Sequence, residues 1–468
     1  MAQAQTIDVS TLIDNRKLDA FNWGLVILSF FVILSDGFDI GAIAIAAPEL
    51  RKIGVISSPS DIGWVLSASL WAILIGSPIG GFIGDRYGRR VAIILSCLIF
   101  GIFTLTIAWA TSVNELIAMR FLAGVGIGGL LPNIIALNAE FAPKRYRATL
   151  VILMFCGITF GGAVPGVVGA TLMPSYGWPI IFWIGGITPL VMAVLVRLFM
   201  PESLKFLVLR ENRAKSPRIR QQIEKSLARL NRGIAVEPNT NFVASGETQY
   251  GGFSPTRLFK NGLGWITPLL WLCFICNLLS FYFITSGLPS VMTNAGIPAT
   301  ETYLGVTLFQ IGGTLGGLTL SRPIDLKGLL PVAILFAIAI PIVGLIGFAA
   351  TSMTWLWIDL FLAGFCSLGL QFGLNASSAL IYPTAFRSNG SGWAFGIGRF
   401  GSAFGSYLGG AVLALHLPLP NLYMLVAIPY VVGTVAAIAL VAVYRRRFGG
   451  FGLGLRDTAE ATAAARSR

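Results

Sequence analysis

Long apolar stretches dominate the chain and alternate with short polar ones. Each apolar stretch is close to the ~20 residues that a helix needs to cross a bilayer. Inside lipid, helices and closed barrels are the only structures that pair all of their backbone polar groups. The pattern therefore predicts an all-α polytopic membrane protein. Its twelve expected transmembrane helices are at residues 22–47, 62–83, 91–110, 114–138, 149–172, 178–200, 264–290, 302–321, 329–350, 354–380, 389–413 and 421–443.

Composition supports a membrane protein. The 468 residues are 55% hydrophobic and only 11% charged, whereas soluble domains carry about 25% charged residues. The N-terminal segment is polar and has no basic-then-apolar leader, so we expect the first helix to direct insertion and no signal peptide to be removed. The five cysteines lie in apolar stretches, which favours packing over disulfides.

The net charge of +13 is distributed by loop. Every second loop is basic, and the intervening loops carry almost no basic residues apart from Arg51 and Lys52. This alternation is the positive-inside pattern. It predicts that both termini are cytoplasmic, and it explains the charge without a nucleic-acid partner. The basic positions are Arg16, Lys17, Arg86, Arg89, Arg90, Lys144, Arg145, Arg147, Arg322, Lys327, Arg387, Arg445, Arg446 and Arg447, together with those of segment 202–262.

The two halves of the chain repeat each other at an offset of 240 residues. The matching pairs include Gly76 with Gly316, Asp85 with Asp325, Gly88 with Gly328, Leu122–Gly124 with Leu362–Gly364, Pro143 with Pro383, Arg147 with Arg387, and Gly161 with Gly401. A parallel duplication of a six-helix half explains this spacing, and some transporters are built in this way. We expect an N-terminal bundle at 1–201, a cytoplasmic linker at 202–262 with a surface helix within 216–232, a C-terminal bundle at 263–448 and a disordered tail at 449–468.

Two carboxylates, Asp36 and Asp39, lie inside the first apolar stretch. A charged group at bilayer depth costs about 2.5–3.5 kcal/mol on insertion scales, so such groups usually serve a proton, an ion or a substrate. A spacing of three residues places both on one helix face. We expect them to address one cavity; the alternative is that they lie near a helix end and are solvated.

Arg399 is the second unusual charge, in the middle of an apolar stretch. Arginine stays protonated in proteins, and its planar fork suits a carboxylate. Its partner is either a substrate carboxylate or an internal one, for which Asp36, Asp39 and Asp359 are the candidates. Arg120 is similar but closer to a helix end, where a structural arginine that snorkels to water is the alternative to a role in proton handling.

Polar stripes mark three of the later helices. Side chains three or four residues apart lie on one helix face and either line a cavity or bond to a neighbouring helix. The stripes are Ser367, Gln371, Asn375 and Ser378; Thr307, Gln310 and Thr314; and Asn277 with Phe281 and Tyr282. The expected substrate-binding residues are Arg399, Phe38, Asn277, Phe281, Tyr282, Gln310, Gln371, Phe372, Asn375 and Trp393.

Three motifs resemble the signatures of the major facilitator superfamily. They are GFIGDRYGRR at 81–90, Arg120-Phe-Leu-Ala-Gly-Val-Gly-Ile-Gly-Gly129, and Pro201-Glu202-Ser203. Asp36-Gly37-Phe38-Asp39 and Gly396-Ile397-Gly398-Arg399 further resemble the aromatic acid:proton symporter family of bacteria. The second-half copy of the loop keeps Asp325 and Gly328, but Leu326 replaces Arg86.

This resemblance implies a fold of two pseudo-symmetric six-helix bundles. It also implies proton-coupled import of a small aromatic carboxylate, of benzoate or hydroxybenzoate type, by alternating access. Asp39 is then the main proton carrier, with Asp36 in support and Arg120 beside them. The gating residues implied are Asp85, Arg86, Gly88, Arg89, Arg90, Glu140, Arg147, Asp325 and Arg387, and the loop at 85–90 is expected to latch the outward-open state.

Other functions lack a motif. The single histidine, His416, and the missing phosphate-binding loop argue against an enzyme, a metal, a cofactor or direct ATP use. The expected partners are the aromatic acid, protons and the lipid bilayer, and the chain is expected to be a monomer. Two alternatives stay open: a drug or organic-ion exporting antiporter, although Pro165 is displaced from the exporters' Gly-Pro pattern, and a non-transporting aromatic acid sensor.

Overall fold

Helices make up nearly all of the structure. The computed structural model describes residues 6–143, 145–214, 217–230, 240–243, 258–259, 263–382 and 387–448. Its elements are β1 (Thr6–Asp8), α1 (Val9–Asp14), α2 (Ala20–Lys52), α3 (Pro59–Tyr87), α4 (Arg89–Ile107), α5 (Val113–Phe141), α6 (Arg147–Thr171), α7 (Met173–Tyr176), α8 (Pro179–Phe199), α9 (Leu204–Ala214), α10 (Pro217–Leu230), β2 (Asn241–Val243), α11 (Ile266–Asn294), α12 (Ala299–Lys327), α13 (Leu330–Ala349), α14 (Met353–Ile381), α15 (Arg387–Ala411), the 3-10 turn η2 (Val412–Leu415) and α16 (Leu419–Phe448).

Each of the twelve expected spans falls on a helix. Eleven of the described helices are long and apolar enough to cross a membrane. The remaining expected span is α15, which has 25 residues but is rich in Gly and Ser and carries Arg399. Because α15 packs along α11 and α3, it needs less lipid-compatible surface than the other spans.

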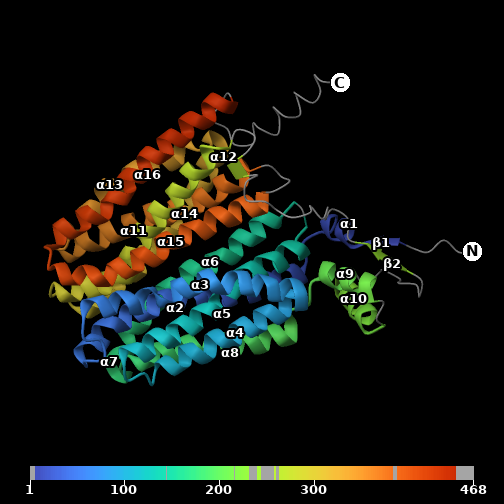
Figure 1. The fold of residues 1–468 in the computed structure, drawn as a ribbon, viewed down its shortest axis with the longest axis horizontal. Helices are drawn as coiled ribbons and strands as arrows, with labels where there is room; N and C mark the ends of the chain where they lie inside the picture. Colours follow the sequence, from blue (N-terminus) through green and yellow to red (C-terminus); the bar gives the residue numbers. More distant parts are fainter. Residues whose placement is uncertain are drawn as a thin grey trace, which may run out of the picture.

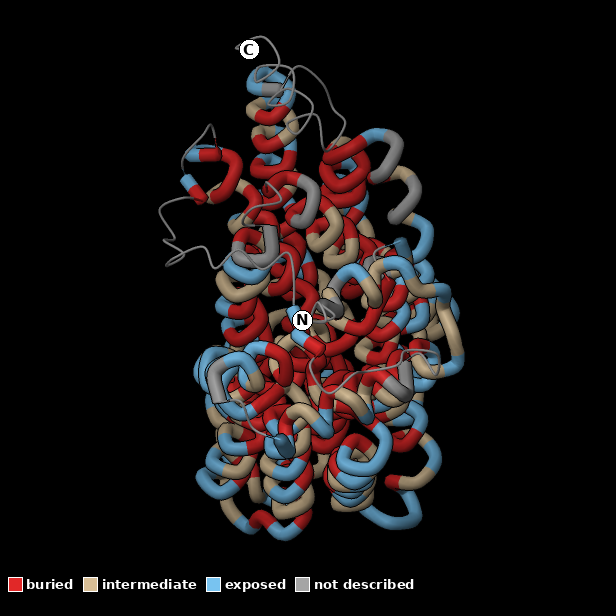
Figure 2. The backbone as a smooth tube through the Cα atoms, turned by 90° about the vertical axis from the view of Figure 1, so that its right-hand side faces the viewer, coloured by how far each residue is buried: buried red, intermediate tan, exposed pale blue. Residues whose placement is uncertain are grey.

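Many large apolar side chains are exposed, and Figure 2 shows that the buried positions lie mainly toward the inside of the molecule. Soluble proteins rarely expose such extensive apolar surface, whereas a lipid environment favours it. Trp109, Trp265 and Trp355 are 63%, 76% and 65% exposed and lie near helix ends. Tryptophans are enriched at these depths, where the bilayer meets water.

The helices form two similar bundles, α2–α8 and α11–α16, which lie side by side (Figure 1). The bounds of α3, α5 and α6 become those of α12, α14 and α15 when shifted by 240 residues. The packing repeats as well, because α3 contacts α5 as α12 contacts α14, and α2 contacts α6 as α11 contacts α15. The duplication seen in the sequence is therefore a duplication of structure.

Glycine allows the closest of these helix contacts, and its positions are also repeated. A Cβ on Gly76 would lie 2.3 Å from the carbonyl oxygen of Val125, and one on Gly316 would lie 2.1 Å from that of Phe365. Both distances are shorter than any Cβ tolerates, so only glycine lets these backbones approach. Small residues serve this purpose at membrane helix interfaces generally.

The two ends of the bundles differ in charge and in contacts. We call the end with loop 85–90 and Arg445–Arg447 the basic end, and the end with loops 53–58, 172–178 and 295–298 the short-loop end. Figure 1 shows α7 at the short-loop end, far from α1, α9 and α10. Among the described residues, the side-chain hydrogen bonds that join the bundles lie toward the short-loop end. They are Arg51 to Asn294 (3.2 Å), Tyr303 to the Ile45 carbonyl (3.3 Å), Thr307 to the Ala163 carbonyl (3.1 Å) and Ser406 to the Leu66 carbonyl (3.1 Å).

A small module at the basic end was only partly predicted. The expected surface helix within 216–232 is confirmed as α10, but sequence reasoning missed α9 and a two-stranded parallel sheet of β1 with β2. Arg220 links the module's parts, since it pairs with Glu211 and Glu224 and stacks on Phe242. The expected disordered tail at 449–468 lies outside the described residues, as do linker residues 215–216, 231–239, 244–257 and 260–262.

Candidate functional site

Arg120 and Asp39 form an ion pair inside the N-terminal bundle. The guanidinium Nη1 lies 3.4 Å from the Asp39 Oδ1, and the two side chains are only 1% and 2% exposed. Arg120 also donates from Nε to the Val65 carbonyl (2.8 Å) and from Nη2 to the Ser69 hydroxyl (2.6 Å). The alternative of an arginine that snorkels to water is therefore wrong, because this head group is paired and enclosed.

Asp36 lies on the same helix but faces a different charge. It is 4% exposed, and the charges that act on it are those of Arg399 of α15 in the other bundle and of Asp39 on its own helix. The two carboxylates of α2 are thus divided between two arginines. Asp39 forms an ion pair within its own bundle, whereas Asp36 interacts electrostatically with Arg399 of the opposite bundle.

Arg399 is buried among neutral groups. Its side chain is 8% exposed, its Nη1 lies 3.3 Å from the Tyr282 hydroxyl, and its guanidinium carbon lies 4.6 Å from the centre of the Phe395 ring. Among the described residues, no carboxylate oxygen lies within 4.0 Å of the Arg399 guanidinium, the largest distance at which the two would form an ion pair. Arg399 therefore has no direct ion pair at mid-helix depth, although the charge of Asp36 acts on it at longer range.

A row of amides extends the polar region across α11 and α14. The side-chain amide of Asn277 donates to the side-chain oxygen of Gln371 (3.1 Å), and the side-chain amide of Gln371 donates to the side-chain oxygen of Asn375 (3.3 Å). The carbonyl oxygens of Asn277 and of Gln310 on α12 are buried without a hydrogen-bond partner. Buried polar groups are normally satisfied, so these two acceptors are available to a bound group.

The aromatic candidates divide into two sets. Phe281 packs edge-on against Tyr282 with ring centres 5.1 Å apart, and stacks on Phe309 at 5.8 Å, which places an aromatic wall beside Arg399. The other three contact residues of their own bundle. Phe38 packs against Gly185 and Phe372 against Gly317, while Trp393 is 41% exposed and stacks on Trp271.

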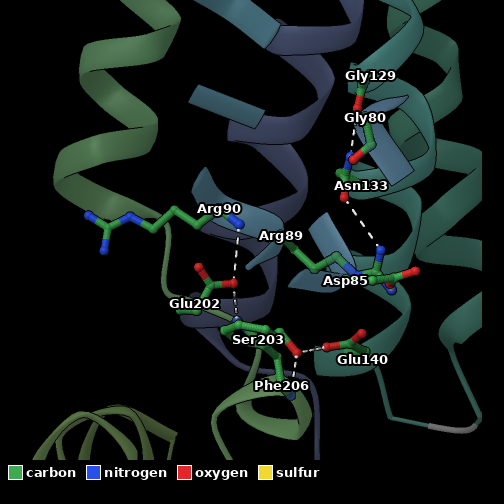
Figure 3. A network of polar contacts seen from close by, with 10 residues as sticks. All are labelled: Gly80, Asp85, Arg89, Arg90, Gly129, Asn133, Glu140, Glu202, Ser203 and Phe206. Carbon is green, nitrogen blue, oxygen red and sulfur yellow. Dashed lines mark hydrogen bonds and ion pairs between the residues drawn. The ribbon is translucent and has the colours of Figure 1, made fainter. Parts of the chain in front are cut away.

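Four of the expected gating residues, Asp85, Arg89, Arg90 and Glu140, take part in a network of polar contacts at the basic end (Figure 3). Asp85 pairs with Arg89 at 2.5 Å, and Arg89 contacts the Asn133 side chain at 3.4 Å. The Glu202 carboxylate accepts the backbone N–H groups of Arg90 (3.2 Å) and Ser203 (2.9 Å). Ser203 in turn donates from its hydroxyl to Glu140. The loop is thereby joined to α5 and to the start of α9.

Other gating candidates are placed less completely. Arg86 lies over the rings of Phe82 and Tyr87, at 5.9 and 5.8 Å. Gly88 joins α3 to α4 at φ 114°, a region that favours glycine. Arg147, Asp325 and Arg387 lie in α6, α12 and α15, but their side chains lie outside the described residues. In this state Asp85 is 68% exposed.

Glu202 is a titratable group of this network whose pKa is shifted. Burial raises the pKa of Glu202 above its usual value, and the hydrogen bonds from Ser203 and Arg90, together with the Arg90 charge, oppose that rise. The buried Glu202 carboxylate thus loses solvation, but it also holds loop 85–90 in place through its hydrogen bond from the Arg90 N–H.

Sequence reasoning missed several residues of the site. Ser69 and the Val65 carbonyl hold Arg120, but hydroxyls and carbonyls give no distinctive sequence signal. Phe395 could have been found, because it precedes Arg399 by one helical turn and must share its face. Phe309 required the structure, since it belongs to another helix.

Comparison with known proteins identifies the class that this fold and site define. Residues 28–264 match the family model described as Major Facilitator Superfamily. The chain is 34% identical to the gallate transporter of Pseudomonas putida, over 92% of this chain and 95% of the relative. It is 31% identical to the 4-hydroxybenzoate transporter PcaK of Acinetobacter baylyi, over 94% of each chain.

The chain belongs to the Major Facilitator Superfamily, and it is a multi-pass membrane transporter rather than an enzyme. Its similarity is to the superfamily's transporters of aromatic acids, which confirms the resemblance drawn from the motifs. Solved structures agree on the fold. The partially occluded, inward open xylose transporter XylE of E. coli has a TM-score of 0.67 at 18% identity, over 92% of this chain and 98% of that one.

Proposed function

We propose that this chain imports a small aromatic carboxylate together with protons by alternating access. It acts as a monomer in a bacterial inner membrane, with both termini in the cytoplasm. The substrate class is supported by the relatives, which are named as gallate, 4-hydroxybenzoate and benzoate transporters. The orientation is supported by the basic loops, which gather at one end of the bundles.

One observation supports the substrate class: Arg399 is buried and charged, and no described carboxylate forms an ion pair with it. An unpaired charge in such a site is costly, and a bidentate carboxylate is the partner that its planar fork fits best. The aromatic wall of Phe281 and Tyr282 lies beside it, so one ligand with a carboxylate and a ring satisfies both features. The free carbonyl oxygens of Asn277 and Gln310 can accept hydrogen bonds from a ring hydroxyl.

Proton coupling is supported by the division of the two carboxylates. While Asp36 is ionised, its negative charge weakens the electrostatic attraction between Arg399 and a substrate anion. A proton on Asp36 removes this competition, so proton and substrate favour each other's binding, as linkage requires. A proton on Asp39, the main carrier, removes the charge that holds Arg120 and frees α2 from α5.

The number of protons carried with each substrate molecule decides whether the membrane potential drives uptake. One elementary charge crossing 100 mV is worth about 2.3 kcal/mol. A monoanion carried with one proton is neutral and uses only the pH gradient. With two protons it carries net positive charge and also uses the potential, and Asp36 and Asp39 together provide two sites.

The direct test of the substrate class is binding of benzoate against its uncharged amide. Purified protein is titrated with benzoate and with benzamide by calorimetry, and the same titration is made with Arg399→Ala. The proposal expects the wild type to bind benzoate at least tenfold more tightly than benzamide, because a charge-assisted hydrogen bond contributes about 1.5–3 kcal/mol. The variant should show no detectable binding of benzoate and therefore no preference for it. Equal affinity of the wild-type protein for the two ligands would refute the carboxylate clamp.

A further inference from the structure

The ring of Phe395 lies against the buried guanidinium of Arg399. The guanidinium carbon is 4.6 Å from the ring centre, well inside the ~6 Å at which a cation and an aromatic face attract each other. Both residues belong to α15, and Phe395 precedes Arg399 by one helical turn. Phe395 is itself partly buried and packs against the apolar core. The ring is therefore held in place by the bundle and can in turn restrain the arginine.

The ring restrains Arg399 without occupying its hydrogen-bonding groups. A phenyl ring attracts a cation through its negative face and has no oxygen or nitrogen to accept from the five N–H donors of a guanidinium. Among the described residues, the Arg399 side chain makes one hydrogen bond, to the Tyr282 hydroxyl at 3.3 Å. The other N–H donors are left for a ligand.

A restrained arginine binds an anion at a lower cost. The arginine side chain has several rotatable bonds and much rotamer freedom, and immobilising such a side chain on binding reduces affinity. Phe395 of α15 and Tyr282 of α11 contact the head group from two different helices. Together they hold the position of the guanidinium, and much of the ordering cost is then met by the fold.

We propose that Phe395 is a positioning residue of the substrate site, whose ring holds the Arg399 guanidinium ready for the substrate carboxylate. This role rests on the proposed function, in which Arg399 binds that carboxylate. Phe395 acts through the arginine and not through the ring of the substrate. It therefore contributes to the preference for a carboxylate over an uncharged group, whereas a residue that packs on the substrate ring contributes to both.

The 240-residue repeat supplies a matched control. Phe155 of α6 is the counterpart of Phe395, but Thr159 takes the place of Arg399. Phe155 is likewise partly buried and packed against the core, and the Thr159 hydroxyl donates to the carbonyl of Cys156 in its own helix at 2.9 Å. The same aromatic position thus exists in both bundles, and an arginine follows it in one of them.

The test compares two ligands and two kinds of side chain. Purified full-length protein is titrated with benzoate and with benzamide by calorimetry, as wild type and as Phe395→Leu, which keeps an apolar side chain but has no aromatic face. We expect benzoate affinity to fall about three- to tenfold, in line with the strength of a cation–π contact, and benzamide affinity to stay unchanged. Phe395→Tyr retains the ring and should keep wild-type benzoate affinity.

Phe155→Leu is the control and should change neither affinity. Unfolding temperatures verify that each variant is folded, and Phe395→Met repeats the comparison if the leucine variant is not. Wild-type benzoate affinity in Phe395→Leu would overturn the proposal. An equal loss for benzoate and benzamide, or the same benzoate loss in Phe155→Leu, would do so too, because either result would assign the effect to ring contact or general packing.

Failure of this proposal is distinguishable from failure of the proposed function. A wild-type protein that binds benzoate and benzamide equally would refute the role of Arg399 and, with it, that of Phe395. A preference for benzoate that is lost in Arg399→Ala but kept in full by Phe395→Leu would refute the role of Phe395 alone.

Discussion

At the scale of single residues, the buried arginines Arg120 and Arg399 differ in whether a carboxylate pairs with their charge. Arg120 has a carboxylate, a carbonyl and a hydroxyl within hydrogen-bonding distance, so its charge is satisfied inside one bundle. Arg399 has a phenol and a ring, so its charge remains open. In the proposed function, this difference separates an arginine that takes part in proton coupling, Arg120, from one that binds the substrate, Arg399.

Arg399→Lys tests the geometry of the clamp rather than its charge. Lysine keeps the positive charge but loses the planar fork. We expect benzoate affinity to fall about tenfold or more in the lysine variant, since one of two charge-assisted bonds is lost, and to be undetectable in Arg399→Ala. Calorimetric titration measures both. Wild-type affinity in the lysine variant would show that no bidentate contact forms.

Asp39→Asn tests the proton carrier. The amide keeps the shape of the side chain but cannot exchange a proton at working pH. We expect the variant to lose accumulation driven by a pH gradient while it retains exchange of labelled for unlabelled substrate, because exchange needs no net proton movement. Asp36→Asn should lose less. Accumulation at the wild-type level by Asp39→Asn would rule out its role as main carrier.

Glu202→Gln tests the buried carboxylate of the basic end by pH. Burial raises the pKa of Glu202 in the folded protein above its usual 4.5. Its contribution to stability is therefore present below pH ~4.5 and lost as pH rises through the folded pKa. The glutamine variant keeps an oxygen for the Arg90 and Ser203 N–H groups and has no such titration. We expect the wild-type unfolding temperature to fall relative to that of the variant as pH rises above ~4.5; a parallel pH dependence would contradict this.

At the scale of helices, close packing through glycine decides which substitutions the bundles tolerate. Gly316→Ala and Gly344→Ala form a matched pair, since both place a methyl group in a helix interior. A Cβ on Gly316 would lie 2.1 Å from the Phe365 carbonyl oxygen, whereas one on Gly344 would have its nearest neighbour at 3.8 Å. We expect Gly316→Ala to cost about 1–3 kcal/mol through overpacking and Gly344→Ala to be neutral or stabilising. Unfolding temperatures measure the difference, and equal values would contradict the close contact.

Much of the helix arrangement could be predicted because hydropathy and the 240-residue repeat are local or periodic signals. The module at the basic end could not, because β1 and β2 have three residues each and are paired across more than two hundred residues of chain. Within the site, the apolar stretch around Asp36 and Asp39 drew attention to both carboxylates, and both are buried. Their different arginine partners depend on how α5 and α15 approach α2, and no single-chain pattern contains that information.

At the scale of the whole molecule, hydrogen bonds join the two bundles at the short-loop end. At the basic end, the Asp85 side chain is exposed. Hydrogen bonds such as Tyr303 to Ile45 and Ser406 to Leu66 must break for the short-loop end to open. A transporter that alternates between two such states needs these contacts to be few and polar, so that their loss costs only a few kcal/mol. In the proposed cycle this is the state that releases substrate to the cytoplasm.

The most direct test of the central claim is uptake in proteoliposomes. Purified protein is reconstituted, and labelled 4-hydroxybenzoate is added outside at pH 7 with and without an inward proton gradient. We predict accumulation above the outside concentration when the gradient is present, collapse of that accumulation by a protonophore, and none with Arg399→Ala. Equilibration without accumulation, or net outward movement driven by the same gradient, would contradict the account of a proton-coupled importer.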